Sequence, residues 1–467
     1  MASSIYYLTV VLSAALFCVG IAFLLKKPFF KLSTSAVYQL DIILNPLIDE
    51  IAKDRLILKN LVNLLVNFFT VLLFTLIIIL FSIAPIYALV SIVPSTILDT
   101  NSIYFYLSML IGSFSLFFLK KKSDYSYWSK LLHTLVLNNY HVGKYLFKLE
   151  VKQLTNENSK NNKFVIVTGL ARAGTTALIK QLYNPTIFHS IKYANIPFLL
   201  APSFWKKIYN PKKSKERERA HNDKVIFSEN SIEALEEYFF KVFLNDEYIK
   251  NDSLIAHDID VELFKNYLLY QQLFKNTKSD NTIYLAKNNN FILRFESMRK
   301  LSNNFKVILV FRHPFAHANS LLAQHHNFSA KQTDDTFVLN YMNWLGHYEF
   351  GLNQKYFDLN NHNLLQNLSK NDINYWVAIW INYYSYIIQF LNDENIILVD
   401  YDDLLNKPNE LNQVLLKHLN INYQFEKIND FTSNKSFSFK LEDLNDDLSA
   451  QAIEIYKVLI AKKELVS

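Results

Sequence analysis

Residues 164–182 read Phe164-Val-Ile-Val-Thr168-Gly-Leu-Ala-Arg172-Ala-Gly174-Thr-Thr-Ala-Leu-Ile-Lys-Gln-Leu182, and this stretch decides the fold. Its first five residues are almost wholly apolar and do not alternate with polar ones, as in a strand buried on both faces. Two of the chain's seven glycines follow within six residues, and a helix is expected to begin near Thr175. This order predicts an anion cradle, in which backbone N–H groups and the positive end of the helix face the ligand. The alternative is a tight turn that binds nothing.

The rest of the soluble part repeats the same kinds of element. Short apolar runs at 283–286, 306–311 and 396–400 also lack alternation, and helical stretches separate them. This pattern predicts an α/β domain with a largely parallel central sheet over 163–467. Before it, residues 123–162 are expected to form a helical connector and a polar, asparagine-rich linker.

The loop differs from the phosphate loop of ATPases and kinases at one decisive position. The spacing of Gly169 and Gly174 fits the G-x-x-x-x-G-K-[ST] pattern, but Thr175 stands where that pattern has lysine. The basic residue of this loop is Arg172 instead. A membrane-anchored P-loop NTPase or kinase is therefore weakened and remains an alternative.

The loop resembles the 5′-phosphosulfate loop of sulfotransferases that use the donor 3′-phosphoadenosine 5′-phosphosulfate (PAPS). That loop has a basic residue followed by Ser-Gly-Thr-Thr, and residues 172–176 match it except that Ala173 replaces the serine. The resemblance implies a P-loop-like sulfotransferase fold with a central parallel sheet. It also implies that the donor's sulfate end is bound by Gly169, Arg172, Gly174, Thr175 and Thr176.

Three further matches follow in the family's order along the chain. Arg312 ends the run 306–311, and Ser320 comes eight residues after Arg312. In the family these two side chains grip the 3′-phosphate of PAPS. Tyr401 follows the run 396–400 and resembles the tyrosine that lies by the adenine. Lys287, after the run 283–286, resembles a lysine near the transferred sulfuryl group, although the following Asn-Asn-Asn departs from the usual motif.

The resemblance implies transfer of a sulfuryl group from PAPS to a hydroxyl group. No metal ion is expected, because no His, Asp or Glu cluster has a convincing ligand spacing. Arg172 and Lys287 are expected to offset charge on the departing oxygen. Neither of the family's two usual base positions holds an acid or a histidine, since Asn289 stands at one of them. His221, oriented by Asp223, is the predicted catalytic base. His189 and His347 are further candidates, and a non-catalytic protein with a degenerate nucleotide site is a third possible function.

The first 122 residues predict a membrane region. Hydrophobic residues make up 51% of the chain and charged residues only 19%, and the excess lies before residue 120. Uncharged apolar runs at 5–25, 61–83 and 103–119 predict three transmembrane helices. A cleaved signal peptide at 5–25 is the rival interpretation, but a basic start is lacking.

Basic residues predict the orientation of these spans. Lysine and arginine cluster between the first and second spans, and Lys120, Lys121 and Lys122 follow the third. The positive-inside rule then places residues after 120 in the cytoplasm. The sole cysteine, Cys18, permits no internal disulfide, which is compatible with a reducing compartment. We expect a membrane-proximal carbohydrate or lipid as the hydroxyl acceptor, and no nucleic acid partner.

Overall fold

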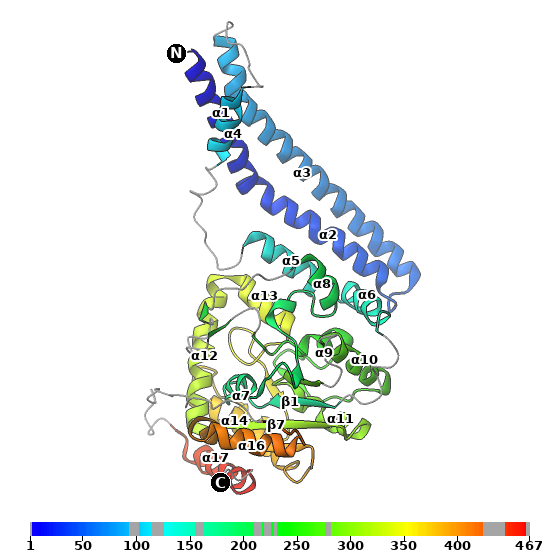
Figure 1. The fold of residues 1–467 in the computed structure, drawn as a ribbon, viewed down its shortest axis with the longest axis vertical. Coiled ribbons are helices and arrows are strands. Elements are labelled where there is room, and N and C mark those ends of the chain that lie inside the picture. The colour runs from blue at the N-terminus through cyan, green and yellow to red at the C-terminus, as the bar shows by residue number, and fades with distance from the viewer. Residues whose placement is uncertain are drawn as a thin grey trace. The chain divides into compact units, whose positions relative to one another are not determined.

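The computed structural model describes residues 2–92, 102–113, 126–154, 163–209, 217–218, 226–227, 231–275, 282–423 and 444–463 (Figure 1). It divides into two compact units, Met1–Val142 and Gly143–Ser467. Each unit is described by itself.

The first unit is helical. Its elements are α1 (Ala2–Gly20), the π-helical turn η1 (Ile21–Leu25), α2 (Lys26–Leu44), α3 (Glu50–Ile92), α4 (Ile103–Ser113) and α5 (Tyr127–Leu137). The stretches Ser4–Leu44 and Glu50–Ile92 are long and apolar enough to cross a membrane by length and composition. The third predicted span is described only as far as Ser113, and 114–119 lie outside the described residues.

Small residues let the helices of this unit approach one another. A Cβ atom at Gly112 of α4 would lie 2.3 Å from the backbone oxygen of Val11 in α1, and one at Gly20 would lie 3.0 Å from the side chain of Ile78 in α3. Close backbone approach at glycine is typical of helix pairs in membranes, where packing replaces the hydrophobic effect. The Nδ2 group of Asn60 donates to the oxygen of Ser35 at 3.0 Å, which joins α3 to α2.

The second unit contains the expected parallel sheet. Its strand order is β2-β6-β1-β7-β9, and every neighbouring pair is parallel. The strands are β1 (Phe164–Thr168), β2 (Phe188–His189), β6 (Ile283–Lys287), β7 (Phe305–Phe311) and β9 (Ile396–Asp400). The α/β prediction and four of these strands are thereby confirmed. The short edge strand β2 was not expected, because two residues give no periodic signal.

Helices and two small sheets complete this unit. The helices are α6 (Tyr140–Val151), α7 (Thr175–Leu182), η4 (Tyr193–Asn195), α8 (Pro202–Ile208), α9 (Glu237–Phe243), α10 (Val261–Gln272), η5 (Phe291–Arg294), α11 (Phe295–Leu301), α12 (Pro314–Asp334), α13 (Thr336–Leu345), η6 (His362–Leu365), α14 (Ile373–Ile388), α15 (Tyr401–Asn406), α16 (Pro408–His418) and α17 (Asp446–Lys462). An antiparallel pair joins β3 (Arg217–Glu218) to β4 (Ile226–Phe227), and a parallel pair joins β5 (Ser253–Ile255) to β8 (Tyr356–Asp358).

The central strands are buried on both faces, which explains their lack of alternation. Every residue of β1 and of β9 is buried. Helices α7 and α16 pack through Leu178 and Leu415 into the same apolar cluster as Val165. A strand covered on both faces gains burial at every position, so a continuous apolar run is the stable choice.

The strand order reverses at the carboxyl end of β1. From β1 the chain passes to β2 and β6 on one side of it, and then returns to β7 and β9 on the other side. Ligands of open α/β sheets bind where the strand order reverses in this way, beyond the carboxyl ends of the strands. The loop 169–174 lies at this point.

Candidate functional site

The loop after β1 has the backbone of an anion cradle. Gly169, Arg172 and Gly174 have φ angles of 149°, 71° and 109°, which is the left-handed region that favours glycine. Gly174 is the N-cap of α7 and provides no side-chain cap. The first N–H groups of α7 therefore lack the usual intrahelical or capping acceptor, and the helix dipole favours an anion beside them.

Arg172 of the loop and Arg312, which follows β7, place two cationic side chains near each other. Arg172 Nε donates to Ser320 Oγ on α12 at 3.3 Å, so the loop is joined to the serine expected to bind the 3′-phosphate. Burial lowers the pKa of Arg312, and the nearby charge of Arg172 lowers it further. Like charges held close together in a partly buried site favour an anionic ligand between them.

Tyr401 stands between Arg312 and the loop. The Arg312 guanidinium carbon lies 4.6 Å from the centre of the Tyr401 ring, within cation–π range. The indole N–H of Trp380 donates to the backbone oxygen of Arg312 at 3.1 Å and fixes its position. Tyr401 also packs so closely on Gly174 that a Cβ atom there would lie 2.4 Å from the ring. The three motifs that carry Arg172, Arg312 and Tyr401 therefore meet.

Lys287 approaches the other side of the loop. Its Nζ donates to Thr176 Oγ1 at 2.7 Å, and the side chain is buried. The Thr175 hydroxyl donates to Asn289 Oδ1 at 3.5 Å. Lys287 thus lies beside the first turn of α7, where its predicted place near the transferred group stays a prediction.

A carboxylate and a histidine continue from Asn289. Asn289 Nδ2 donates to Glu349 Oε1 at 3.2 Å, and His347 Nδ1 lies 3.4 Å from the same oxygen. Burial by itself raises the pKa of Glu349, but His347 and Asn289 more than offset this and hold that pKa at about 2. An ionised carboxylate beside Nδ1 of His347 favours a proton on that nitrogen and leaves Nε2 to accept one.

The other predicted bases do not join this group. His189 lies on β2 opposite Tyr284, three residues before Lys287 and toward the amino end of β6. Its Nδ1 contacts Thr282 Oγ1 at 3.0 Å, and burial lowers its pKa to about 4. His189 is therefore a buried histidine at the amino end of the sheet, opposite the end that carries the loop. His221 and Asp223 lie outside the described residues.

His317 is a feature of the site that the sequence did not indicate. It is fully buried on α12, and its Nε2 lies 2.7 Å from the backbone oxygen of Ala171 in the loop. Burial lowers the pKa of His317 to about 3, so the ring is neutral and its Nε2–H donates. This bond holds the loop next to Arg172, whose φ angle is positive. Proximity to Arg312 and Arg172 could have been expected from sequence, but the bond to Ala171 could not.

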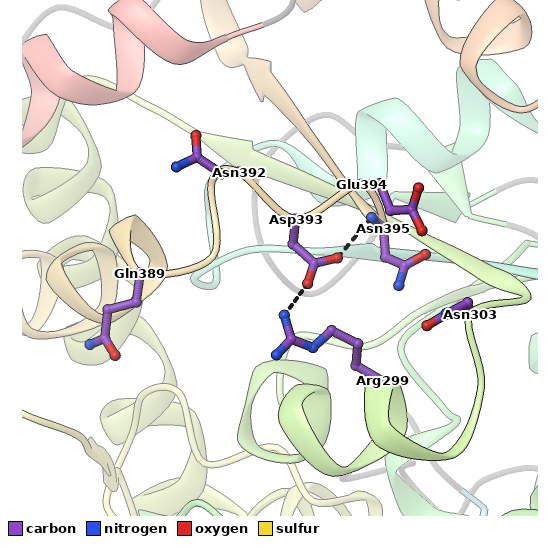
Figure 2. A pocket seen from close by; sticks show the side chains of 7 residues that line it. All are labelled: Arg299, Asn303, Gln389, Asn392, Asp393, Glu394 and Asn395. Carbon is purple, nitrogen blue, oxygen red and sulfur yellow. Dashed lines mark hydrogen bonds and ion pairs between the residues drawn. The ribbon is translucent and has the colours of Figure 1, made fainter.

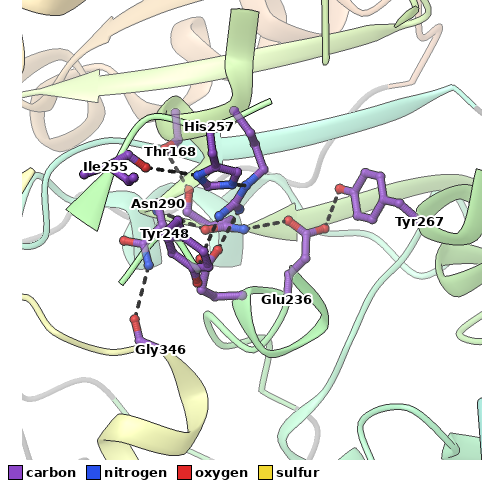
Figure 3. Close-up of polar contacts among 11 residues, drawn as sticks. Thr168, Glu236, Tyr248, Ile255, His257, Tyr267, Asn290 and Gly346 are labelled. Atoms are coloured by element: carbon purple, nitrogen blue, oxygen red, sulfur yellow. Dashed lines mark hydrogen bonds and ion pairs between the residues drawn. The ribbon is translucent and has the colours of Figure 1, made fainter. Parts of the chain in front are cut away.

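A buried polar network supports the end of β6 (Figure 3). Glu236 accepts from Tyr267 at 2.7 Å and from Asn288 at 3.1 Å. Its neighbour Glu237 forms a two-bond ion pair with Arg294, each bond 2.7 Å long. Asn288 also accepts at its backbone oxygen from Thr168 of β1 at 2.7 Å. The network therefore ties the carboxyl end of β1 to the residues that follow β6. Its sequence signal was a pair of acids before an apolar helix.

A shallow polar pocket lies away from this site (Figure 2). Arg299 and Asp393 form an ion pair there, and Asn395 directly precedes β9. This pocket is at the amino end of β9, whereas Tyr401 follows its carboxyl end. Within the described ranges, no three His, Cys, Asp or Glu side chains cluster as metal ligands.

Gly174→Ala is expected to weaken binding of PAP, the product form of the expected donor PAPS. Its φ of 109° and the contact with the Tyr401 ring leave no room for a methyl group. Strain of this kind costs about 1–3 kcal/mol, or roughly 5- to 150-fold in affinity if it falls on the bound state. Calorimetric titration with PAP measures the change. Gly143→Ala is the matched control, because its Cβ would meet only side-chain atoms, namely the flexible Leu200 at 3.1 Å and the Tyr238 hydroxyl at 3.9 Å. Equal affinities for wild type and Gly174→Ala would show that the loop does not hold the ligand.

Comparison with known proteins gives structural neighbours only. No protein-family model matches the chain, and no curated protein matches it. Sulfotransferase STF9 from Mycobacterium avium is similar in structure, with a TM-score of 0.39, 13% identity, and coverage of 74% of this chain and 88% of the other. Sulfotransferase STF1 from Mycobacterium tuberculosis has a TM-score of 0.35 and 11% identity, with 68% of this chain and 78% of the other covered. A sulfotransferase from Alicyclobacillus acidocaldarius has a TM-score of 0.31 and 13% identity, with 66% of this chain and 97% of the other covered. At such TM-scores and identities, the likeness by itself assigns no activity to this chain.

Proposed function

We propose that this protein is a sulfotransferase that moves a sulfuryl group from PAPS to a hydroxyl group. The proposal rests on the meeting of four residues at one loop. Lys287 ends β6, and Arg172, Arg312 and Tyr401 come after β1, β7 and β9. Their contacts join them around one glycine-containing loop. A structural role for each residue alone would not require them to meet.

The donor has an anionic group for each of the cationic ones. The N–H groups of the loop and α7 bind the 5′-phosphosulfate. Arg312 and Ser320 bind the 3′-phosphate, and Tyr401 lies by the adenine. The link between Arg172 and Ser320 supports a single continuous site for both ends of the nucleotide. Arginine suits this task because its planar, permanent charge forms paired bonds to phosphate.

The chemistry needs positioning and charge stabilisation more than covalent help. The acceptor oxygen forms a bond to sulfur as the bond from sulfur to the bridging phosphate oxygen breaks, which yields a sulfate ester and PAP. Lys287 and Arg172 offset the charge that develops on the bridging oxygen. Lys287 is suited to this because its Nζ is already held at Thr176, in the first turn of α7.

The acceptor hydroxyl gives its proton to a histidine in this proposal. His221, with Asp223, is one candidate. His347 is the other, supported by its contact with Glu349 and by the link from Glu349 through Asn289 to Thr175. A neutral histidine can accept a proton near neutral pH.

The helical unit is proposed to anchor the protein in a membrane, with the catalytic unit on the cytoplasmic side. Two long apolar helices support the anchor, and the lysine clusters support the orientation. A cytoplasmic site has access to cytosolic PAPS, and a membrane-proximal carbohydrate or lipid is the proposed acceptor.

Arg312→Ala tests the assignment of the nucleotide. Loss of charge-assisted bonds to the 3′-phosphate is expected to weaken PAP binding by about 1.5–3 kcal/mol, or roughly 10- to 150-fold. Binding of adenosine 5′-phosphosulfate, which lacks the 3′-phosphate, should fall far less. Calorimetric titration of both nucleotides gives the difference.

Arg299→Ala is the control for the removal of an arginine. Arg299 is exposed, pairs with Asp393, and lies in the pocket at the other end of the sheet. It should leave both affinities unchanged. Equal losses for the two nucleotides in Arg312→Ala would contradict the proposed 3′-phosphate site, and tighter binding of ATP than of PAPS would favour an NTPase or kinase.

A further inference from the structure

Two helices of the Gly143–Ser467 unit present apolar side chains to solvent. On α6, Tyr145 and Leu149 are 48% and 40% exposed, and on α8, Phe204 and Ile208 are 43% and 64% exposed. The members of each pair are four residues apart, so they lie on one face of their helix. Exposed apolar faces of this kind usually mark an interaction site.

A buried carboxylate holds the two helices together. Glu150, near the end of α6, accepts hydrogen bonds from the backbone N–H groups of Ser203, at 3.2 Å, and Phe204. It thereby caps the first turn of α8. α6 and α8 are therefore neighbours, and we refer to their exposed residues together as the α6–α8 surface.

Aromatic rings give this surface an amphipathic edge. The Trp205 ring stacks between Phe198 and Tyr209, with ring centres 5.1 and 5.0 Å away. The Trp205 N–H is bound to the oxygen of Ala194 at 3.0 Å, so the stack is fixed. Tryptophan and tyrosine beside exposed aliphatic side chains are typical of the boundary between lipid and water.

The charge of the surface is one-sided. Residues 143–154 and 192–209 include one carboxylate, Glu150, which the cap already uses. The same residues contain the lysines Lys144, Lys148, Lys152, Lys192, Lys206 and Lys207. Burial lowers the pKa of Lys192, and the charge of Lys206 lowers it further, so positive charges gather here. An anionic partner would relieve this repulsion.

We infer that the α6–α8 surface lies on the anionic headgroups of a bilayer, with Phe204 and Ile208 inserted among the acyl chains. Apolar residues flanked by lysines are the pattern of interfacial helices. The inference rests on the proposed membrane anchor, since only 114–139 separate α4 from α6. Docking would give the protein a second attachment to the membrane, besides the proposed helical anchor, and would hold the catalytic unit at the lipid surface.

Site-directed spin labelling of the full chain tests the docking. Cys18 is the only cysteine, so Cys18→Ser permits a nitroxide at Ile208→Cys alone. The protein is reconstituted into phosphatidylcholine vesicles with or without phosphatidylglycerol. Oxygen concentrates in the acyl chains and a nickel chelate stays in water. In anionic vesicles, the label at 208 should therefore relax more with oxygen than with nickel.

The matched control is a label at Val458→Cys, an exposed aliphatic position on α17. Figure 1 shows α17 at the end of this unit opposite to α6 and α8. The label at 458 should respond more to nickel than to oxygen. With Lys206→Glu and Lys207→Glu made together, the label at 208 should respond to oxygen and nickel as the label at 458 does.

The outcomes separate the docking from the anchor. Protein that fails to float with the vesicles would refute the anchor itself. Protein that floats while the label at 208 responds like the label at 458 would overturn the docking and leave the anchor standing. An equal lipid response in vesicles without phosphatidylglycerol would overturn the anionic partner. None of these readings depends on PAPS.

Discussion

Glu237→Ala is expected to lower the free energy of unfolding of the Gly143–Ser467 unit by about 3–5 kcal/mol. Glu237 and Arg294 are fully buried and joined by two bonds of 2.7 Å, and the Tyr248 hydroxyl also donates to Glu237. Removing the carboxylate leaves the guanidinium charge without its counter-ion in the interior. Urea unfolding followed by tryptophan fluorescence measures the change, since four of the five tryptophans lie in this unit.

Two controls separate burial from charge. Arg299→Ala removes the exposed partner of Asp393 and should cost only about 0–1 kcal/mol. Glu237→Leu combined with Arg294→Met removes both charges and keeps the volume, and it should recover much of the loss. A loss below about 1 kcal/mol for Glu237→Ala would mean that the ion pair does not stabilise the fold.

The same network reaches the candidate site. Arg294 lies over the Phe240 ring, with 4.0 Å between the guanidinium carbon and the ring centre. Beside it, Asn288 binds Glu236 and Asn290 binds the oxygen of Gly346, at 3.1 and 3.2 Å. These contacts hold the residues that flank Lys287 and the segment that carries His347. Weakening the network should therefore disturb the site as well as the fold.

The sequence predicted the sheet and the nucleotide motifs because both depend on local patterns. Strands buried on both faces must be apolar throughout, so β1, β6, β7 and β9 stood out as short continuous runs. The parallel sheet then brings their carboxyl ends together, and the residues that follow them meet without any further information. Arg172, Lys287, Arg312 and Tyr401 were named from their resemblance to sulfotransferase motifs, and the parallel sheet explains why these motifs meet.

The sequence could not predict contacts between distant side chains. The bond from His317 to Ala171 joins residues 146 apart, and the pair of Glu237 and Arg294 joins residues 57 apart. Neither has a local spacing that distinguishes it from an ordinary helix. His189 was considered as a base for the same reason, because a histidine in sequence does not reveal which end of a strand it occupies.

The helix bounds show a different limit. Charge marks where an apolar run ends, and the first span was predicted to end at Leu25 for that reason. The helical backbone instead continues through Lys26 and Lys27 to Leu44. Lysine is a good helix former, so it ends the apolar segment without ending the helix.

Removal of the catalytic base has the largest expected effect on rate. His221→Ala is expected to lower turnover by about 10²–10⁴-fold, the usual loss of a general base, with PAP affinity unchanged. Transfer of radiolabelled sulfur from PAPS into a native membrane extract measures turnover, and calorimetry with PAP measures affinity. A parallel loss of affinity would indicate a structural role instead.

Turnover within a few-fold of wild type in His221→Ala would transfer the role to His347. His347→Ala should then cause the 10²–10⁴-fold loss instead, again with PAP affinity unchanged. Glu349→Gln should lose less, because an amide oxygen still accepts the bond from Nδ1 of His347 but brings no charge to stabilise the protonated ring. Full turnover in both histidine variants would contradict a histidine base, and the acceptor would then have to lose its proton to another group.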